Sequence, residues 1–581
     1  MKKAINQYGK LVDIIESIKT DTYTCPICNE ILTRNFGEKS QYYSHPKGTG
    51  DECELKIKLI LKENESCPEE NIYILKKEYY DKEFPDVTIE LSDYKTNDRY
   101  FLTQEQKEII ISKEKRIKIS ALAGSAKTST LYYYAKERPF KKILYIVYNR
   151  AMKDEADKTF GKLKNVEVRT QHSLAYGYVG KFYKNKLTLN YGVVDVIKDL
   201  NLDWNKDMEL ASKVYGMMNE YMLSDVEDFN DLEMFDDSEK SIIVSQCRRL
   251  WDLQKEYYNN AKVTHDFYLK CFQLSKKDLS NKYDILLLDE CQDSSLLTLD
   301  IIKSSNIEGV VMVGDSYQQL YSWRLATNIM PYFEGKEYRL TTSFRVSQNI
   351  ANITNMIVKD ICGVDINMKG FNTSQKIVSE INKNEPFVCL CRTNAYIFAE
   401  AFEVLLKNKY AKLFFEGGYS SYNFNNILDG YYFSNGHRVK NPLFNKFKDY
   451  YSMIDYANEV DEHEILAIHK MIDKYGSKIP DIINGIKNNV VKDKKNADVI
   501  LSTVHRAKGQ TYVIPVYISD DIINITDKIR DSYYKGIDLL NFYEDMCIIY
   551  VAITRAFSEI EFPEKIKEYL LFKLDNHPIK H

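Results

Sequence analysis

The chain has 581 residues, of which 44% are hydrophobic and 28% are charged, and its formal net charge is −4. This length predicts several domains, and the composition excludes a membrane-spanning or low-complexity chain. The sequence contains no signal peptide and no apolar run long enough to cross a bilayer. We therefore expect a protein of the cytoplasm or nucleoid, or of the host cell interior if it is viral, that is not secreted. The net charge favours no partner, so a surface for nucleic acid must be a local patch.

A cluster of cysteine and histidine residues lies near the N-terminus. Cys25-Pro-Ile-Cys28 forms a knuckle that can place two thiolates on one metal ion, and His45 and Cys53 can complete a tetrahedral set. Cys67 is an alternative ligand, and reduced thiols in a small core are the alternative interpretation. We expect a structural Zn²⁺ module that binds DNA or a protein partner.

A loop of small residues follows a strand-like run and precedes a helix-like segment. It reads Ala121-Leu-Ala-Gly-Ser-Ala-Lys-Thr128. Backbone N–H groups of such a loop can approach a triphosphate, and the helix N-terminus favours an anion. Lys127 can reach the β- and γ-phosphates and Thr128 can bind Mg²⁺, so the pattern indicates ATP. Ala126 stands where glycine usually precedes the lysine, and its Cβ can crowd the phosphate or strain the turn. A strand–turn–helix without a ligand is the alternative.

A second signal is an apolar run that ends in carboxylates, Asp284-Ile-Leu-Leu-Leu-Asp289-Glu290-Cys-Gln292-Asp293. Strand ends of this kind lie beside the phosphate loop in parallel-sheet ATPases. Asp289 can hold Mg²⁺ through water, and Glu290 can polarise the attacking water. A buried strand with a polar exit is the alternative interpretation.

Strand-like runs alternate with helix-like segments beyond Phe101, which predicts an α/β fold. The runs cover Lys141–Tyr148, Asp284–Asp289, Gly309–Gly314, Pro386–Cys391 and Val499–Thr503. Residues 180–280 and 395–495 are helix-rich and interrupt the alternation. We expect them to be insertions between core strands.

Further motifs follow in a fixed order. They begin at Leu102-Thr-Gln-Glu-Gln106, Val147-Tyr-Asn-Arg150, Thr170-Gln-His-Ser173, Val313-Gly-Asp-Ser-Tyr-Gln318, Leu340-Thr-Thr-Ser-Phe-Arg345, Thr503-Val-His505 and Glu544-Asp-Met. Together with the phosphate loop and the carboxylate strand, this series resembles superfamily 1 helicases of the UvrD/Rep type. Thr264–Lys270, Cys391–Ala395 and Phe415–Tyr419 resemble the F-box DNA helicase branch. We find no F-box, so no ubiquitin-ligase role is carried over.

The resemblance implies two RecA-like parallel-sheet domains with helical insertions, beside the small N-terminal zinc-binding module. The expected boundaries are 1–65 for the zinc-binding module, 66–100 for a connector, 101–179 with 281–334 for domain 1A, 180–280 for insertion 1B, 335–394 with 496–565 for domain 2A, 395–495 for insertion 2B and 566–581 for a C-terminal tail.

The resemblance also implies roles in ATP hydrolysis. Gln318 matches a residue that senses the γ-phosphate, and Arg345 and Arg555 match the two arginines that the second core domain presents to the transferred phosphoryl group. Gln106 matches the residue that reads adenine. The expected nucleotide-binding set is Gln106, Ala121, Leu122, Ala123, Gly124, Ser125, Ala126, Lys127, Thr128, Ser129, Arg345, Gly509 and Arg555. Thr128 and Asp289 are the expected Mg²⁺ ligands.

Trp323 matches an aromatic residue that stacks on a base, an interaction worth about 1–3 kcal/mol per base that tolerates any sequence. The other matched positions along the DNA strand are Tyr148, Asn149, Thr170, His172, Thr503 and His505. Core aromatic residues and a structural histidine are the alternative interpretations of these positions.

The motifs therefore predict an ATP-dependent helicase or translocase on single-stranded DNA. The resemblance implies 3′→5′ movement in replication, recombination or repair. The alternative is a nucleic-acid-binding ATPase switch or defence component without processive unwinding. Ala126 favours that alternative, and so does Thr511, which replaces a glutamate that binds the nucleotide sugar in relatives. A helicase–nuclease fusion is disfavoured, because only about 25 residues follow the last motif.

Overall fold

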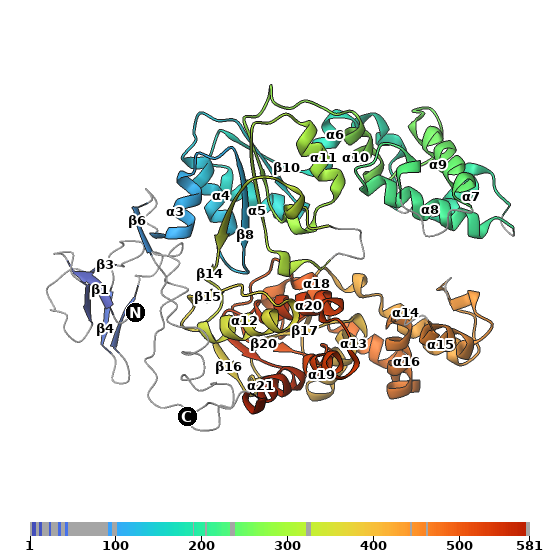
Figure 1. Cartoon of the computed structure of the whole chain (residues 1–581). Coiled ribbons are helices and arrows are strands. Elements are labelled where there is room, and N and C mark those ends of the chain that lie inside the picture. Colours follow the sequence, from blue (N-terminus) through green and yellow to red (C-terminus); the bar gives the residue numbers. More distant parts are fainter. Residues whose placement is uncertain are drawn as a thin grey trace. The chain divides into compact units, whose positions relative to one another are not determined.

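The computed structural model describes residues 101–189, 191–203, 206–232, 239–320, 327–441, 444–459 and 463–576, and short strands before residue 101. The chain divides into two compact units. Unit 1 comprises residues 1–101, 123–125 and 341–581, and unit 2 comprises residues 102–122 and 126–340. Figure 1 labels the elements of both units.

Unit 2 is built on a six-stranded sheet in which all neighbouring strands run parallel, in the order β10-β9-β11-β12-β8-β13. The strands are β8 (Arg116–Ala121), β9 (Ile143–Val147), β10 (Val166–Thr170), β11 (Ile285–Leu288), β12 (Gly309–Gly314) and β13 (Lys336–Leu340). Every residue of β9 and β11 is buried. Such continuous apolar strands are typical of a parallel sheet covered on both faces.

Helices connect these strands and also form a separate lobe. The connecting helices are α3 (Gln104–Ile111), α4 (Lys127–Lys136), α5 (Arg150–Phe160), α6 (Gln171–Tyr178) and α11 (Leu296–Ser304). The lobe contains α7 (Val193–Leu200), α8 (Met208–Leu223), α9 (Lys240–Lys255) and α10 (His265–Leu274), which lie together in Figure 1. Short 3₁₀ turns are η1 (Gly180–Lys186), η2 (Phe229–Asp231), η3 (Cys291–Asp293), η4 (Ser316–Gln318) and η6 (Met330–Tyr332).

The lobe and the sheet of unit 2 share one hydrophobic core. This core contains Leu144 and Ile146 of β9 together with Met218, Trp251 and Phe267 of the lobe. The Trp251 ring lies 4.6 Å from the ring of Phe267 and 5.3 Å from that of Tyr221, centroid to centroid. Aromatic pairs at these distances stabilise a core beyond the area they bury. The lobe is therefore part of the same folded body as the sheet.

Unit 1 contains a second parallel six-stranded sheet, in the order β16-β21-β20-β17-β19-β18. The strands are β16 (Lys376–Val378), β17 (Phe387–Cys391), β18 (Leu413–Phe415), β19 (Val499–Thr503), β20 (Val516–Ile518) and β21 (Glu559–Glu561). Two further short strands, β14 (Thr342–Ser343) and β15 (Lys369–Gly370), pair in parallel beside it.

The helices of unit 1 fall into two groups. Those close to the sheet are α12 (Gln348–Cys362), α13 (Asn394–Lys407), α18 (Val504–Ala507), α19 (Ile525–Lys535), α20 (Tyr543–Ile553) and α21 (Glu564–Asn576). The second group, α14 (Phe424–Ser434), α15 (Tyr450–Glu459), α16 (His463–Tyr475) and α17 (Ile479–Asn488), forms a lobe whose buried residues join those of β17 and β18 in one core.

The α/β class with parallel sheets is confirmed, and each of the five predicted strand runs contains an observed strand. Within the range 395–495 that was predicted as an insertion, β18 pairs with β19 as an edge strand of the sheet. β18 has only three residues, which is too short for a sequence pattern to reveal. Elements also start or end a residue or two from the predicted limits, since helix and strand ends fray.

Before residue 101 the structure describes only strands: β1 (Lys3–Asn6), β2 (Leu11–Asp13), β3 (Tyr23–Thr24), β4 (Thr33–Phe36), β5 (Gln41–Ser44) and β6 (Leu91–Lys95). The predicted zinc ligands Cys25, Cys28, His45 and Cys53 lie outside the described residues. Within the described part of the chain, no group of three or more His, Cys, Asp or Glu side chains is placed to hold a metal ion. Nor does any described helix combine the length and apolar character needed to span a membrane.

Candidate functional site

The predicted site residues of unit 2 gather at one edge of its sheet, because the carboxyl ends of parallel strands meet at the same edge. The adjacent strands β11, β12 and β8 are followed by Asp289–Glu290, by Gln318 and by the phosphate loop. The neighbouring strands β9 and β10 lead into Tyr148–Asn149 and Thr170. Ligands of open parallel sheets bind at this edge. The topology thus places the predicted nucleotide residues on one half of the edge and predicted DNA residues on the other.

Lys127 and Glu290 form a salt bridge, with 2.9 Å between Nζ and Oε1, and their side chains are only 13% and 15% exposed. Burial alone would lower the pKa of Lys127. The carboxylates of Glu290, Asp289 and Asp315 outweigh burial and raise that pKa above its ordinary value. Lys127 therefore carries a full positive charge amid a cluster of acidic groups, and it is the cation that balances them.

Asp289 is buried and accepts a 2.7 Å hydrogen bond at Oδ2 from the hydroxyl of Tyr145. Burial, followed by the nearby carboxylate of Glu290, raises the pKa of Asp289 above its ordinary value. Tyr145 lies on β9 and was not predicted as a site residue, because the apolar run around it indicated only a core strand. A tyrosine in an otherwise aliphatic buried strand is the one signal that could have indicated a polar partner.

A chain of hydrogen bonds links Glu290 to the predicted γ-phosphate sensor Gln318. Gln292 Nε2 donates to Glu290 Oε2 at 2.5 Å, and Gln292 Oε1 accepts from the backbone N–H of Asp315 at 3.0 Å. Gln318 Nε2 donates to Asp315 Oδ2 at 2.7 Å. Of these residues, Gln318 was predicted from the sequence to belong to the site, whereas Gln292 and Asp315 were given no role.

Gly314 permits this arrangement, since a Cβ at that position would lie 2.6 Å from both Cys291 Sγ and Gln292 Oε1. No real side chain tolerates such contacts without a shift of the neighbouring atoms. The polar chain from Glu290 to Gln318 therefore depends on the absence of a side chain at the end of β12.

The phosphate loop has two residues with left-handed backbone. Gly124 has φ +73°, and Ala126, the residue before α4, has φ +59° and ψ +43°. The Ser125 hydroxyl is buried in the same loop without a hydrogen-bond partner. A buried unpaired hydroxyl, a left-handed loop and Lys127 at the start of α4 are features that fit a bound phosphate group. The donor set of Thr128 and Asp289 likewise fits Mg²⁺, which takes one or two protein oxygens together with phosphate oxygens.

We expect Ala126→Gly to raise the free energy of unfolding by about 1 kcal/mol. A left-handed conformation costs an L-residue roughly 1–2 kcal/mol, whereas glycine adopts it freely and loses only part of that gain to unfolded-chain entropy. Urea denaturation measures the change. Ala123→Gly is the matched control: this alanine is buried and has no positive φ, so the same substitution there should destabilise. Equal effects at both positions would contradict the strain argument.

Gln106, predicted to read adenine, is buried and engaged in local hydrogen bonds. Its Oε1 accepts from the backbone N–H of Thr103 at 3.0 Å, which closes the cap of α3, and its Nε2 donates to Thr130 Oγ1 at 3.1 Å. Gln106 therefore ties α3 to α4, the helix that follows the phosphate loop. Its contact with adenine stays a prediction.

In unit 1 the two predicted arginines converge on the end of α20. Arg345 Nη1 donates to the Thr554 carbonyl at 3.2 Å. Arg555 is 1% exposed, and its Nε donates to the carbonyl of Val551 at 3.0 Å and its Nη1 to that of Gln510 at 3.2 Å. Arg345 is thus the more accessible guanidinium, whereas Arg555 is held by backbone carbonyls.

Residues 123–125 of the phosphate loop belong to unit 1 and contact residues near Arg345 and the end of α20. The backbone N–H of Ala123 donates to the Tyr550 hydroxyl at 2.9 Å, and the N–H of Phe344 donates to the Gly124 carbonyl at 2.9 Å. A Cβ on Gly124 would lie 2.6 Å from Cβ of Arg345. The structure therefore brings part of the phosphate loop next to the Arg345 backbone, a proximity that sequence spacing could not predict.

Most of the predicted DNA residues have local structural roles as well. Asn149 Oδ1 caps α5 by accepting from Met152 N at 2.9 Å, and Thr170 caps α6. His172 Nε2 lies 3.0 Å from Asp266 Oδ1. Thr503 ends β19, and Tyr148 is half-buried. These positions stay predictions for strand contact, and Trp323 lies outside the described residues.

His505, in α18 of unit 1, is half-buried. Burial lowers its pKa from the ordinary histidine value, although the carboxylate of Glu544 acts in the opposite direction. Gly509 follows this helix directly after Lys508. A neutral imidazole at this position can accept or donate a hydrogen bond without adding a charge to the site.

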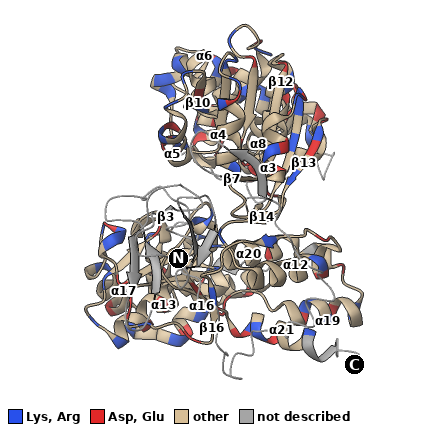
Figure 2. Ribbon diagram, turned by 90° about the vertical axis from the view of Figure 1, so that its left-hand side faces the viewer, with Lys and Arg blue, Asp and Glu red and all other residues tan. Residues whose placement is uncertain are grey.

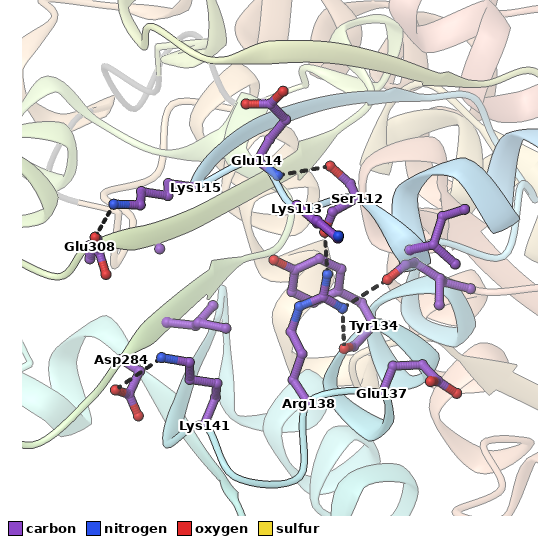
Figure 3. Close-up of a pocket in the computed structure, with 14 residues that line it drawn as sticks. Ser112, Lys113, Glu114, Lys115, Tyr134, Glu137, Arg138, Lys141, Asp284 and Glu308 are labelled. Carbon is purple, nitrogen blue, oxygen red and sulfur yellow. Dashed lines mark hydrogen bonds and ion pairs between the residues drawn. The ribbon is translucent and has the colours of Figure 1, made fainter.

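One pocket of unit 2, about 530 Å³ in volume, lies at the opposite edge of the sheet from these residues. Figure 3 shows Arg138 at its centre, with the guanidinium carbon 3.6 Å from the centroid of the Tyr134 ring. Arg138 Nη1 donates to the carbonyls of Ile110 and Tyr134 at 2.8 and 2.9 Å, which joins the ends of α3 and α4. This pocket is separate from the candidate site.

Figure 2 marks the positions of Lys and Arg and of Asp and Glu along the ribbon of the described residues. Basic and acidic residues are interspersed there over both units, in keeping with the formal net charge of −4. Any nucleic-acid contact must come from local groups of residues rather than from the field of the whole protein.

The comparisons with known proteins agree with this geometry. Residues 102–334 match the UvrD/REP helicase N-terminal domain. F-box DNA helicase 1 of Gallus gallus is 29% identical over 78% of this chain and 48% of its own length. F-box DNA helicase protein 1 of Schizosaccharomyces pombe is 26% identical over 78% of this chain and 56% of its own. The ATP-dependent DNA helicase PcrA of Staphylococcus epidermidis is 24% identical over 44% of this chain and 40% of its own.

These matches define the class that the chain is similar to, the UvrD-like helicases of superfamily 1, which is the class its motifs predicted. Within that class it is similar to the F-box DNA helicases, and it spans about half the length of those curated relatives.

Proposed function

We propose that this protein is an ATP-dependent DNA helicase or translocase that moves along single-stranded DNA. The observation that carries the proposal is the buried pair of Lys127 and Glu290 at the carboxyl edge of the unit 2 sheet, next to Asp289 and the phosphate loop. The pair places the loop lysine beside the carboxylate that would activate water, and an ATPase needs both groups close to the γ-phosphate.

The chain's own residues divide the work of hydrolysis. Lys127 leaves Glu290 to bind the β- and γ-phosphates, and the freed carboxylate of Glu290 then orients and polarises the attacking water. Asp289 and Thr128 would hold Mg²⁺, which when bound offsets charge on the phosphate oxygens. Gln318, connected to Glu290 through Gln292 and Asp315, registers the presence of the γ-phosphate.

Arg345 and Arg555 would supply positive charge to the transferred phosphoryl group, as arginine fingers do. We assign the sheets of unit 2 and unit 1 to RecA-like domains 1A and 2A. The two helical lobes are then insertions 1B and 2B. In this assignment Tyr148, Asn149, Thr170, His172, Trp323, Thr503 and His505 contact the DNA strand.

The relatives are named as DNA helicases, which supports a DNA substrate. A role in replication, recombination or repair is carried over from the family alone. Movement from 3′ to 5′ is carried over from the family alone. The N-terminal residues Cys25, Cys28, His45 and Cys53 are proposed to hold a structural Zn²⁺ that supports contact with DNA or a protein partner.

A second candidate function is a nucleic-acid-dependent ATPase switch or defence component without processive unwinding. The observation that favours it is the left-handed backbone of Ala126, because a strained loop residue can slow the nucleotide cycle. Thr511, which lacks the carboxylate expected to bind the nucleotide sugar, acts in the same direction.

Two assays decide between the candidates. ATP turnover is measured with and without single-stranded DNA, and strand displacement is measured on duplexes with a 3′ or a 5′ tail. Stimulated turnover with displacement of the 3′-tailed duplex supports the helicase. Stimulated turnover without displacement on either substrate supports the switch, and turnover that ignores DNA would refute both.

A further inference from the structure

The helical lobe of unit 2 carries a surface group of lysines and aromatic rings that the candidate site does not use. The group comes from η1 and from the segment between α9 and α10. We call it the basic aromatic patch and define it by Lys181, Phe182, Lys184, Lys255, Tyr257 and Tyr258.

Its two segments are fixed side by side by hydrogen bonds. The N–H of Val263 donates to the carbonyl of Lys186, and the N–H of Thr188 donates to the carbonyl of Val263, both at 3.0 Å. The ammonium group of Lys186 is buried and donates to the carbonyls of Gln254 at 2.8 Å and Glu256 at 2.6 Å, at the end of α9. The patch therefore has a rigid base.

The aromatic rings of the patch face solvent. Tyr258 is fully exposed, and Phe182 and Tyr257 are 58% and 53% exposed. The Tyr257 ring is held in place, with its centroid 5.0 Å from that of buried Tyr183 and 6.0 Å from that of Phe182. Neighbouring exposed rings of this kind mark interaction sites, because monomeric folded proteins rarely expose large contiguous apolar patches.

The charge around these rings has one dominant sign. The segments Gly180–Lys186 and Lys255–Lys262 contain five lysines and one acidic residue, Glu256. Because the ammonium group of Lys186 is buried, the other four lysines are the exposed charges, and Lys181 Nζ lies 5.1 Å from the centroid of the Phe182 ring. Exposed lysines between stackable rings are complementary to a polyanion whose bases are unpaired.

We propose that the basic aromatic patch binds unpaired DNA by stacking on its bases and pairing with its phosphates. The inference rests on the proposed function. Helix α6 joins the patch to Thr170 and His172, and its eight residues span roughly 12 Å at 1.5 Å per residue. The patch thus lies one helix length beyond the residues of unit 2 that are predicted to contact DNA. A long single strand of DNA can reach both places, whereas a short one cannot.

The test measures binding of the full chain to labelled oligothymidylates by fluorescence anisotropy. One oligothymidylate has about 8 nucleotides and the other about 30, so that one is short and one is long compared with a typical single-strand binding site. The double variant Phe182→Ala/Tyr258→Ala should bind the long strand about 30-fold more weakly or worse, since each of the two stacking interactions that it removes is worth about 1 kcal/mol or more. Its affinity for the short strand should change less than about twofold.

A second variant tests the pairing with phosphates without touching the aromatic rings. Lys181→Gln/Lys184→Gln should lower the slope of log affinity against log salt for the long strand by about 1.4, because each phosphate that a lysine neutralises on single-stranded DNA adds about 0.7 to that slope. A purely structural role would not change this slope.

Phe140→Ala is the matched control, because Phe140 is 97% exposed and precedes two lysines but lies beside the opposite edge of the unit 2 sheet. Three results would overturn the proposal. They are an equal loss of affinity in the Phe140→Ala control, an unchanged affinity of the patch variants for the long strand, and a loss of affinity that is confined to blunt duplex. If the wild-type chain binds no single-stranded DNA, the proposed function itself fails. If the wild-type chain binds single-stranded DNA and the patch variants bind it equally well, the proposed function stands and this inference falls.

Discussion

ATP hydrolysis stimulated by DNA is expected to fall by about 100- to 1,000-fold in Glu290→Gln, the loss typical when one preorganised polar group of an active site is removed. Glutamine keeps the size of Glu290, and its one side-chain oxygen can still accept a hydrogen bond from Lys127 or from Gln292, so the fold should survive. It cannot act as a base for water. Steady-state phosphate release in the presence of single-stranded DNA measures the effect.

Lys127→Ala should abolish turnover to a similar extent for a different reason. It removes the cation that contacts phosphate and leaves Glu290, Asp289 and Asp315 without compensation in a buried site. Breaking such a pair costs about 3–5 kcal/mol of stability, so urea denaturation must accompany the assay.

Lys115→Ala is the matched control, because Lys115 pairs with Glu308 in an exposed salt bridge at the other edge of the same sheet. It should leave both turnover and stability near wild type. Wild-type turnover in Glu290→Gln would refute the assignment of the catalytic site.

Arg345→Ala is expected to reduce turnover by about 1,000-fold or more, the range measured when an arginine finger is removed. The truncated residue retains the Cβ that packs near Gly124 and loses the hydrogen bond from Nη1 to the Thr554 carbonyl. The free energy of unfolding should therefore fall by only about 1 kcal/mol. Phosphate release and urea denaturation together separate catalysis from stability.

Arg438→Ala provides the comparison, since Arg438 is an exposed arginine of the same unit. It should change neither quantity. A loss of turnover in Arg345→Ala that merely parallels a large loss of stability would assign Arg345 to packing instead of catalysis.

The strands that carry the candidate site were predictable because parallel strands are continuous apolar runs, and β11 and β12 are such runs. The loop and carboxylates that follow them were predictable from residue type and spacing. The Tyr145–Asp289 hydrogen bond and the chain through Gln292 and Asp315 were not, because they join residues from different strands whose order in the sheet no local pattern reveals.

Ala126 illustrates a partial success. The sequence showed a Cβ where glycine is usual and predicted crowding or strain, and the structure places this residue in the left-handed region. The burial of Arg555 was not foreseen, because a motif match gives a residue's register in the chain but not its hydrogen-bond partners.

The continuous core of unit 2 has a consequence for how its helical lobe can vary. Side chains from β9, α8, α9 and α10 fill one interior, so excising the lobe would leave Leu144 and Ile146 facing water. The lobe therefore cannot be exchanged for that of another protein without a change in the core of the sheet. A change of shape inside it must be matched by the strand beneath, which ties the evolution of a peripheral surface to that of the catalytic scaffold.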